Sequence, residues 1–143
     1  MPRVERSIYI NRPIQEIWDY MTQVEKIPEW AAGVDKTVDI SDTPIKVGTT
    51  FTNVYKLEGK QVTAPHLVTA LEPPRRWELK IWYAAVAITT WHYESEGSGT
   101  KVWVTVDYSF GEKEQRAVDK ELQFLKEVLE TGKIPDASRR GKD

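Results

Sequence analysis

The chain has 143 residues, a formal net charge of −2 and no cysteine. This length suits one domain with a hydrophobic core of its own, and the lack of cysteine excludes disulfides and thiolate metal sites. A near-neutral charge, without a basic run interleaved with aromatic residues, argues against a nucleic-acid-binding protein. No apolar run is long enough to cross a membrane and the N-terminus carries no apolar signal segment, so we expect a cytoplasmic protein without an integral membrane segment.

The N-terminal part of the chain predicts one strand followed by two short helices. Apolar and polar side chains alternate over Val4–Ile10, as in a half-buried strand. After a proline that favours helix entry, Ile14–Met21 carries apolar residues at i, i+3, i+4 and i+7. A second, shorter helical stretch spans Val24–Trp30, is broken or restarted at Pro28 and ends at Gly33.

From residue 34 onwards the apolar pattern has a period of two, which indicates strands. We expect these strands over Val34–Ile40, Thr49–Leu57, Lys60–Leu71, Trp77–Tyr83, Val86–Ser95 and Thr100–Phe110. Pro65 cannot donate a hydrogen bond to a neighbouring strand, so its segment should be an edge strand or contain a bulge. Antiparallel pairing also requires a reversal near Ala84-Ala85, where the sequence has no turn residues.

The last long segment, Glu112–Thr131, predicts one amphipathic helix. Gly132 suits the position that ends a helix, and Pro135 prevents its continuation. The apolar stripe of this helix consists of Val118, Leu122, Phe124, Leu125, Val128 and Leu129. One helix cannot bury such a stripe alone, so it must pack against a sheet.

This order of elements predicts an α+β domain over residues 1–132, followed by a flexible tail over residues 133–143. Consecutive strands with short connections pair antiparallel, and a strongly twisted sheet of about seven strands curls. We expect the C-terminal helix to lie in the concavity and the two short helices to close one end. A curved sheet and one helix do not fill the space between them, so an internal cavity is expected.

Four segments resemble the polyketide cyclase/START-like superfamily, also called SRPBCC, whose helix-grip fold is shared with the birch-pollen allergen proteins. They are Val4–Trp18 (VERSIYINRPIQEIW), Glu25–Trp30 (EKIPEW), Val68–Arg76 (VTALEPPRR) and Gly99–Val102 (GTKV). The segments occur in the family's order, and the resemblance covers about residues 4–132. It implies the helix-grip fold.

The function that this resemblance implies is broader. Members bind hydrophobic molecules such as lipids, sterols, quinones, polyketides and plant hormones; some cyclise or dehydrate polyketides, and others are co-chaperone domains. The fold does not choose among these activities. The Glu25–Trp30 segment looks more like the cyclase and lipid-binding branch than the co-chaperone branch.

Candidate ligand-binding residues are those on the inward parity of the strands and on the apolar face of the last helix. Bulky rings that alternate with tyrosyl hydroxyls are costly to bury dry, which favours a pocket, although plain packing is the alternative at each position. The polar candidates are Asn53, Tyr55, Tyr83, Tyr93 and Tyr108, and the apolar ones on the strands are Phe51, Trp77, Leu79, Ile81, Trp91, Val104 and Val106. The last helix contributes Val118, Glu121, Leu122 and Leu125.

Glu121 is a carboxylate that falls within the apolar arc of the last helix; Glu114 shares that face but lies in the first turn, where a carboxylate favours the helix N-terminus. It either reaches solvent at the margin of the cavity or acts as an acid or base inside it, where burial would shift its pKa toward neutrality. We further expect His66 to be a partly exposed residue of an edge strand, His92 to point outward, and Trp30 to anchor the second short helix over the cavity end.

No cofactor or metal is expected, because the chain has no metal-ligand spacing, no nucleophile elbow and no glycine-rich phosphate loop. The predicted function is binding or transport of a hydrophobic small molecule, such as a lipid, a quinone or a polyketide-like compound, in an internal cavity. One alternative is a polyketide cyclase or dehydratase that uses Glu121 or a tyrosine as acid or base. The other is a protein-interaction module, and the oligomeric state is left open.

Overall fold

The computed structural model describes residues 3–57, 59–83, 85–107 and 112–136, with the backbone alone for residue 57 and residues 112–117. One long helix, two short α-helices and a short 3-10 helix accompany a single antiparallel sheet. In chain order the elements are β1 (Arg3–Ile10), α1 (Ile14–Met21), η1 (Val24–Lys26), α2 (Ile27–Trp30), β2 (Val34–Val38), β3 (Thr50–Leu57), β4 (Lys60–Glu72), β5 (Arg76–Tyr83), β6 (Ala85–Glu96), β7 (Gly99–Asp107) and α3 (Glu112–Thr131).

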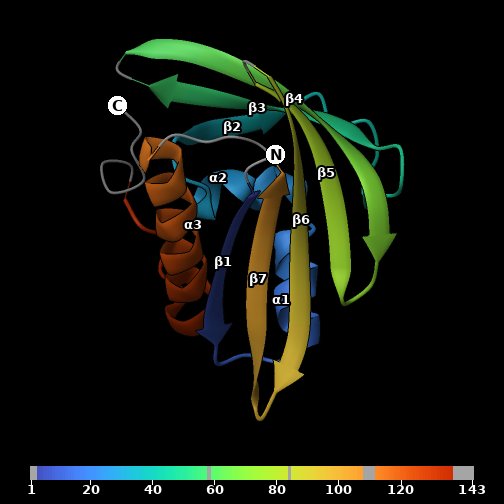
Figure 1. The fold of residues 1–143 in the computed structure, drawn as a ribbon, viewed down its shortest axis with the longest axis vertical. Coiled ribbons are helices and arrows are strands. Elements are labelled where there is room, and N and C mark those ends of the chain that lie inside the picture. The colour runs from blue at the N-terminus through green and yellow to red at the C-terminus, as the bar shows by residue number, and fades with distance from the viewer. Residues whose placement is uncertain (1–2, 58, 84, 108–111, 137–143) are drawn as a thin grey trace.

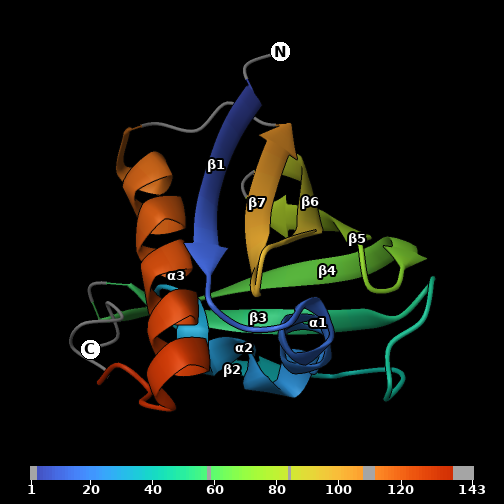
Figure 2. The ribbon, with the colours of Figure 1, turned by 90° about the horizontal axis from the view of Figure 1, so that it is seen from below.

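The seven strands form one curved sheet in the order β1-β7-β6-β5-β4-β3-β2. Every neighbouring pair is antiparallel. The first strand of the chain, β1, pairs with the last one, β7, and the other strands pair with their neighbours in the sequence. The strand direction turns strongly from the β1 edge to the β2 edge, and α3 lies along β1 on the concave side (Figures 1 and 2). The predicted α+β helix-grip architecture, with a curved antiparallel sheet and a long C-terminal helix, is confirmed.

The two short helices close one end of the concave side, as expected. The second helical stretch is divided, because the 3-10 turn η1 runs directly into α2, where Pro28 occupies the first turn. A proline fits there because the first backbone N–H groups of a helix have no partner within the helix. The Tyr20 hydroxyl donates to Glu29 Oε1 at 2.8 Å and fixes α1 relative to α2.

The prediction for Pro65 is only partly correct. Strand β4 is an interior strand, between β3 and β5, and not an edge. However, β5 pairs with β4 only from His66 onwards, so Pro65 lies in the half of β4 that pairs with β3 alone and its missing N–H removes no bond to β5. The irregularity in β4 lies between Val68 and Ala70.

Two expectations fall on residues outside the described ranges. Strands β5 and β6 stay in register up to the pair Tyr83 and Ala85, and residue 84, where the reversal was expected, is not described. Tyr108 also lies outside the described residues, as do residues 137–143 of the predicted tail.

Helix α3 is tied to the start of the chain at its C-terminal end. The backbone N–H of Asn11 donates to Glu130 Oε2 at 2.7 Å, and Arg12 Nη2 donates to the Glu130 carbonyl at 2.6 Å. Gly132, with φ of 74°, ends the helix in the left-handed conformation that its sequence position predicted. The buried stripe of Leu122, Phe124, Leu125 and Leu129 joins the hydrophobic core between α3 and the sheet.

None of the described helices is long and apolar enough to cross a membrane.

Candidate ligand-binding cavity

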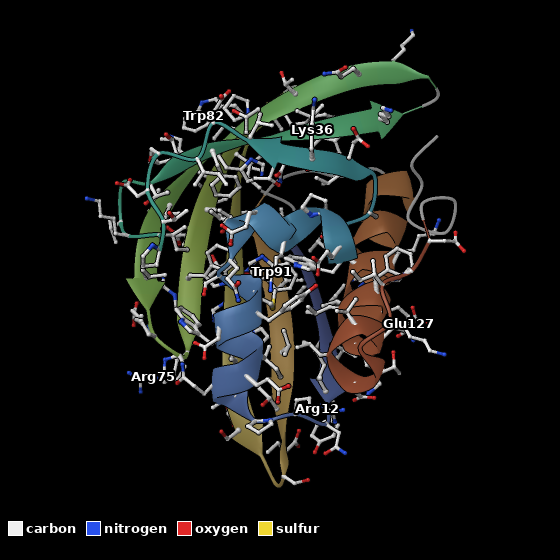
Figure 3. All side chains as sticks on the ribbon, turned by 180° about the vertical axis from the view of Figure 1, so that it is seen from behind. Arg12, Lys36, Arg75, Trp82, Trp91 and Glu127 are labelled. Atoms are coloured by element: carbon white, nitrogen blue, oxygen red, sulfur yellow. The ribbon has the colours of Figure 1, made fainter. Side chains whose placement is uncertain are left out.

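A cavity of about 290 Å³ lies between the concave face of the sheet, α2 and the middle of α3. Its wall is dominated by aromatic and aliphatic side chains. Trp91, from the middle of the sheet, projects to this inner side, whereas Lys36, Arg75 and Trp82 lie on the outside of the molecule (Figure 3). The space that a bent sheet and a single helix leave between them is therefore present in the structure.

Most of the residues predicted to contact a ligand line this cavity. They are Asn53, Tyr55, Trp77, Leu79, Ile81, Tyr83, Trp91, Val104, Val106, Val118 and Glu121. Their positions follow from the period of two along the strands, because alternate side chains project to the same face of a sheet. The paired strands β3, β5, β6 and β7 bring them together from distant parts of the sequence.

Four of the residues predicted to contact a ligand are not part of the cavity wall. At these positions the alternative, plain packing in the hydrophobic core, is what the structure shows. Phe51, Leu122 and Leu125 are buried in the hydrophobic core. The Tyr93 hydroxyl accepts a hydrogen bond from Trp77 Nε1 at 2.8 Å and donates to Met21 Sδ at 3.2 Å. Both polar capacities of Tyr93 are thus used within the protein, in the region where α1 covers the sheet.

Other lining residues were not predicted from the sequence. Those on α2 and the following segment are Ile27, Trp30, Ala31, Ala32 and Val34, and those on the strands are His66, Ala87 and Thr89. The strand residues share the inward parity of predicted ones, since His66 pairs with Phe51 and Ala87 pairs with Ile81. Continuing that alternation along β4 and β6 would have identified them.

Trp30 closes the end of the cavity that α2 covers, in agreement with its expected position. Its side chain is only 3% exposed, and its ring meets the ring of Trp91 at 90°, with the centroids 5.5 Å apart. Trp30 Nε1 has no hydrogen-bond partner among the described residues. The edge-to-face packing of two indoles makes this wall rigid as well as apolar.

A polarised chain of hydrogen bonds lines one side of the cavity. Thr37 Oγ1 donates to Asn53 Oδ1 at 2.7 Å, and Asn53 Nδ2 lies 3.4 Å from His66 Nε2. His66 Nδ1 lies 2.8 Å from the Ala64 carbonyl, which can only accept, so Nδ1 carries the proton and Nε2 is the acceptor.

The prediction that His66 is a partly exposed edge residue is wrong. Its side chain is 4% exposed and stacks on Phe51 with the centroids 4.9 Å apart. Burial lowers the pKa of His66 to about 4, so the ring is neutral at physiological pH. His92 points away from the cavity, as expected, and is only partly buried. On that outer face of β6 its ring stacks on the ring of Trp103, with the centroids 4.8 Å apart.

Among the described residues, Glu121 is the only carboxylate in the cavity wall, and no lysine or arginine lines it. Part of its surface remains accessible because it faces the cavity. Burial nevertheless raises the pKa of Glu121 to about 8, since no cation there offsets the loss of water. Burial, and secondarily the charge of the nearby Glu121, raise the pKa of Tyr55 as well.

A second hollow, of about 450 Å³, lies between α1, η1 and the segment before β3. Although it is larger, its polar residues Asp19, Gln23 and Glu25 are exposed to solvent. These side chains are therefore already hydrated, and none of them is a buried polar group that a ligand would have to satisfy. The first cavity, with Asn53 and Glu121 in an apolar wall, is the better candidate for a binding site.

The described residues contain no group of three or more histidine, cysteine, aspartate or glutamate side chains that could hold a metal ion.

Several solved structures share this fold at low sequence identity. Protein CV1439 from Chromobacterium violaceum has a TM-score of 0.76 at 13% identity, over 95% of this chain and 100% of that one. Ara h 8.0201 has a TM-score of 0.71 at 14% identity, over 90% of this chain and 94% of that one. DynU16, described as a putative protein in the dynemicin biosynthetic locus, has a TM-score of 0.73 at 16% identity, over 92% of this chain and 48% of that one.

At these identities the structural matches show the fold alone, and a comparison with curated proteins finds no match. The family assignment comes from the sequence, because residues 1–132 match the family model described as polyketide cyclase / dehydrase and lipid transport. The resemblance seen in the four sequence segments is thus confirmed. The chain belongs to the polyketide cyclase / dehydrase and lipid transport family.

Proposed function

We propose that this protein binds a hydrophobic small molecule, of lipid, quinone or polyketide-like character, in the cavity between α3 and the sheet. The observation that carries the proposal is the cavity itself, about 290 Å³ in volume and walled largely by aromatic and aliphatic side chains. When a ligand enters such a space its apolar surface leaves water, which contributes about 25 cal/mol of favourable free energy per Å² of apolar surface buried.

The volume of the cavity and the residues of its wall restrict the class of ligand. Its volume is near the lower end of the roughly 300–1,000 Å³ typical of small-molecule sites, which favours a compact ligand over a long two-chain lipid. Polar atoms in the largely apolar wall come from Asn53, Tyr55, His66, Tyr83, Thr89 and Glu121. A molecule with a hydrophobic body and a polar group matches that composition.

Native mass spectrometry of the purified protein tests the proposal. We expect a population whose mass exceeds that of the chain by one small molecule, and we expect this excess to disappear when the protein is denatured. Extraction into organic solvent would then identify the compound. A bare chain that also fails to take up any apolar dye would contradict the proposal.

Catalysis is the second candidate, and the raised pKa of Glu121 favours it. A carboxyl with a pKa of about 8 is mostly protonated at neutral pH, so it could donate a proton to a carbonyl or to a departing hydroxyl of a polyketide-like substrate. Such an enzyme would lose turnover in Glu121→Gln while keeping its ligand affinity. Its rate would also fall as the pH rises through about 8.

A further inference from the structure

The described wall of the cavity contains one carboxyl group and no cationic side chain. The carboxyl is that of Glu121, and no lysine or arginine is among the described residues of the wall. The described part of the chain also provides Glu121 with no ion pair, although several carboxylates on the outside of the protein have one, such as Asp119 with Arg6 at 3.2 Å. Ionised Glu121 thus has no counter-ion among the described residues, and a cationic ligand would supply one.

Aromatic rings share the cavity wall with this carboxyl. Tyr55 and Tyr83 line the same cavity as Glu121, and their rings lie 5.7 Å apart at an angle of 49°. Trp30 and Trp91 form a second aromatic pair in the same wall. The faces of such rings attract cations, and the attraction grows when the cation is removed from water.

Two other polar side chains of the wall are partnered within the protein. Asn53 receives a hydrogen bond from Thr37, and its amide nitrogen lies 3.4 Å from His66 Nε2. His66 is held by the Ala64 carbonyl. Among the described residues of the wall Trp30 Nε1 also lacks a partner, but it is a neutral donor, whereas the carboxyl of Glu121 can become charged.

We infer that the ligand is an amphipathic amine, whose ammonium group pairs with the Glu121 carboxylate beside the Tyr55 and Tyr83 rings and whose hydrophobic body fills the apolar part of the cavity. This inference rests on the proposed binding function and narrows its ligand class. It distinguishes the chain from a carrier of neutral or acidic lipids, because at alkaline pH, where Glu121 is ionised, an anionic ligand would be repelled.

Binding of an ammonium group requires the ionised form of Glu121, so it must be linked to pH. Among the described residues, the titratable groups that face the cavity are Tyr55 from β3, His66 from β4, Tyr83 from β5 and Glu121 itself, while Asp119 and Lys120 on α3 are exposed. His66 is neutral above pH 5 because its pKa is about 4, and the pKa of Tyr55 is raised above its ordinary value.

The sign follows from the protonation of Glu121. At pH 7 about a tenth of a carboxyl with a pKa of 8 is ionised, and at pH 9 about nine-tenths is. An alkylamine stays protonated up to about pH 10. Amine affinity should therefore rise about tenfold from pH 7 to pH 9, and binding at pH 7 should release close to one proton.

Isothermal titration with phenylbutylamine and its neutral counterpart phenylbutanol tests the inference. We expect the amine to bind the wild-type protein more tightly than the alcohol at pH 9, with the tenfold pH dependence, and with proton release at pH 7 seen as a dependence of the heat on the buffer. Glu121→Gln should lose the preference and the pH dependence. Glu127→Gln, on the outer side of the same helix (Figure 3), should keep both.

The possible failures can be told apart. An alcohol that binds as tightly as the amine at every pH would overturn the amine assignment and leave the proposed binding function standing. Tighter binding of the matched phenylbutanoate would overturn the assignment in the same way. If none of the three compounds binds, the proposed function fails together with the inference.

Discussion

Replacing Glu121 by glutamine should stabilise the ligand-free protein, and the gain should grow with pH. The pKa of Glu121 is raised from 4.5 to about 8, so between these values the folded protein holds a proton that the unfolded chain has lost. Folding stability must then fall as the pH rises from about 4.5 to 8, because the carboxyl ionises more easily in the unfolded state. Glutamine imitates the protonated carboxyl at every pH and removes this loss.

The size of the effect follows from the shift. One pKa unit corresponds to about 1.36 kcal/mol, so the full shift gives a difference of about 4 kcal/mol between pH 5 and pH 8.5. Glu121 keeps partial access to water through the cavity, which lowers the expected value to about 2–4 kcal/mol. At pH 5 the two proteins should differ by less than about 1 kcal/mol.

Urea unfolding at pH 5, 7 and 8.5, for the wild type and Glu121→Gln, measures this difference. Comparing the two proteins at each pH cancels the titration of all other groups. Glu127→Gln is the control, since it removes a carboxylate from the outside of α3. A stability difference for Glu121→Gln that is the same at all three pH values would refute the reasoning.

Three further variants test the structure around the cavity. Because the pKa of His66 is lowered to about 4 from 6.5, the wild type should lose about 2 kcal/mol of stability relative to His66→Gln between pH 7.5 and pH 5; a stability difference between the two proteins that does not change with pH would contradict this. Tyr93→Phe should lower the free energy of unfolding in urea by about 1–3 kcal/mol, because it leaves Trp77 Nε1 without an acceptor. The affinity for an apolar dye should not change, and a large change in that affinity would show that Tyr93 contacts the ligand. Gly99→Ala should lower the melting temperature strongly, since its Cβ would lie 2.6 Å from the Ile10 carbonyl oxygen, and an unchanged melting temperature would show that the strands can move apart.

The architecture could be predicted from the sequence because its main signals are strong and local. Helix α3 has a continuous apolar stripe and ends at Gly132, and its observed range is Glu112–Thr131, as expected. Strands such as β7, where Val102, Val104 and Val106 alternate with other residues, show their buried face directly. The environment of Pro65 was harder to predict, because the sequence does not reveal that the pairing between β4 and β5 ends at His66.

The cavity wall was predicted where it follows the strand period and missed where it depends on tertiary packing. Trp77, Leu79 and Ile81 follow the period, whereas α2 places Trp30 and Ala31 over the cavity end through a bend that no period describes. Conversely, Leu122 and Leu125 share the stripe of α3 with Val118, but the curvature of the sheet covers one part of that helix and leaves the other open.

The central claim, that this cavity binds an apolar molecule, is tested most directly by filling it. Ala87 lines the cavity from β6, and its neighbour Val86 is 44% exposed on the opposite face of that strand, so Ala87→Phe and Val86→Phe add a ring inside and outside respectively. Titration of an apolar fluorescent dye should show saturable binding, at one dye per chain, to the wild type and Val86→Phe. It should show no binding to Ala87→Phe, whose melting temperature should not fall. Equal dye binding by all three proteins, or none by the wild type, would contradict the account.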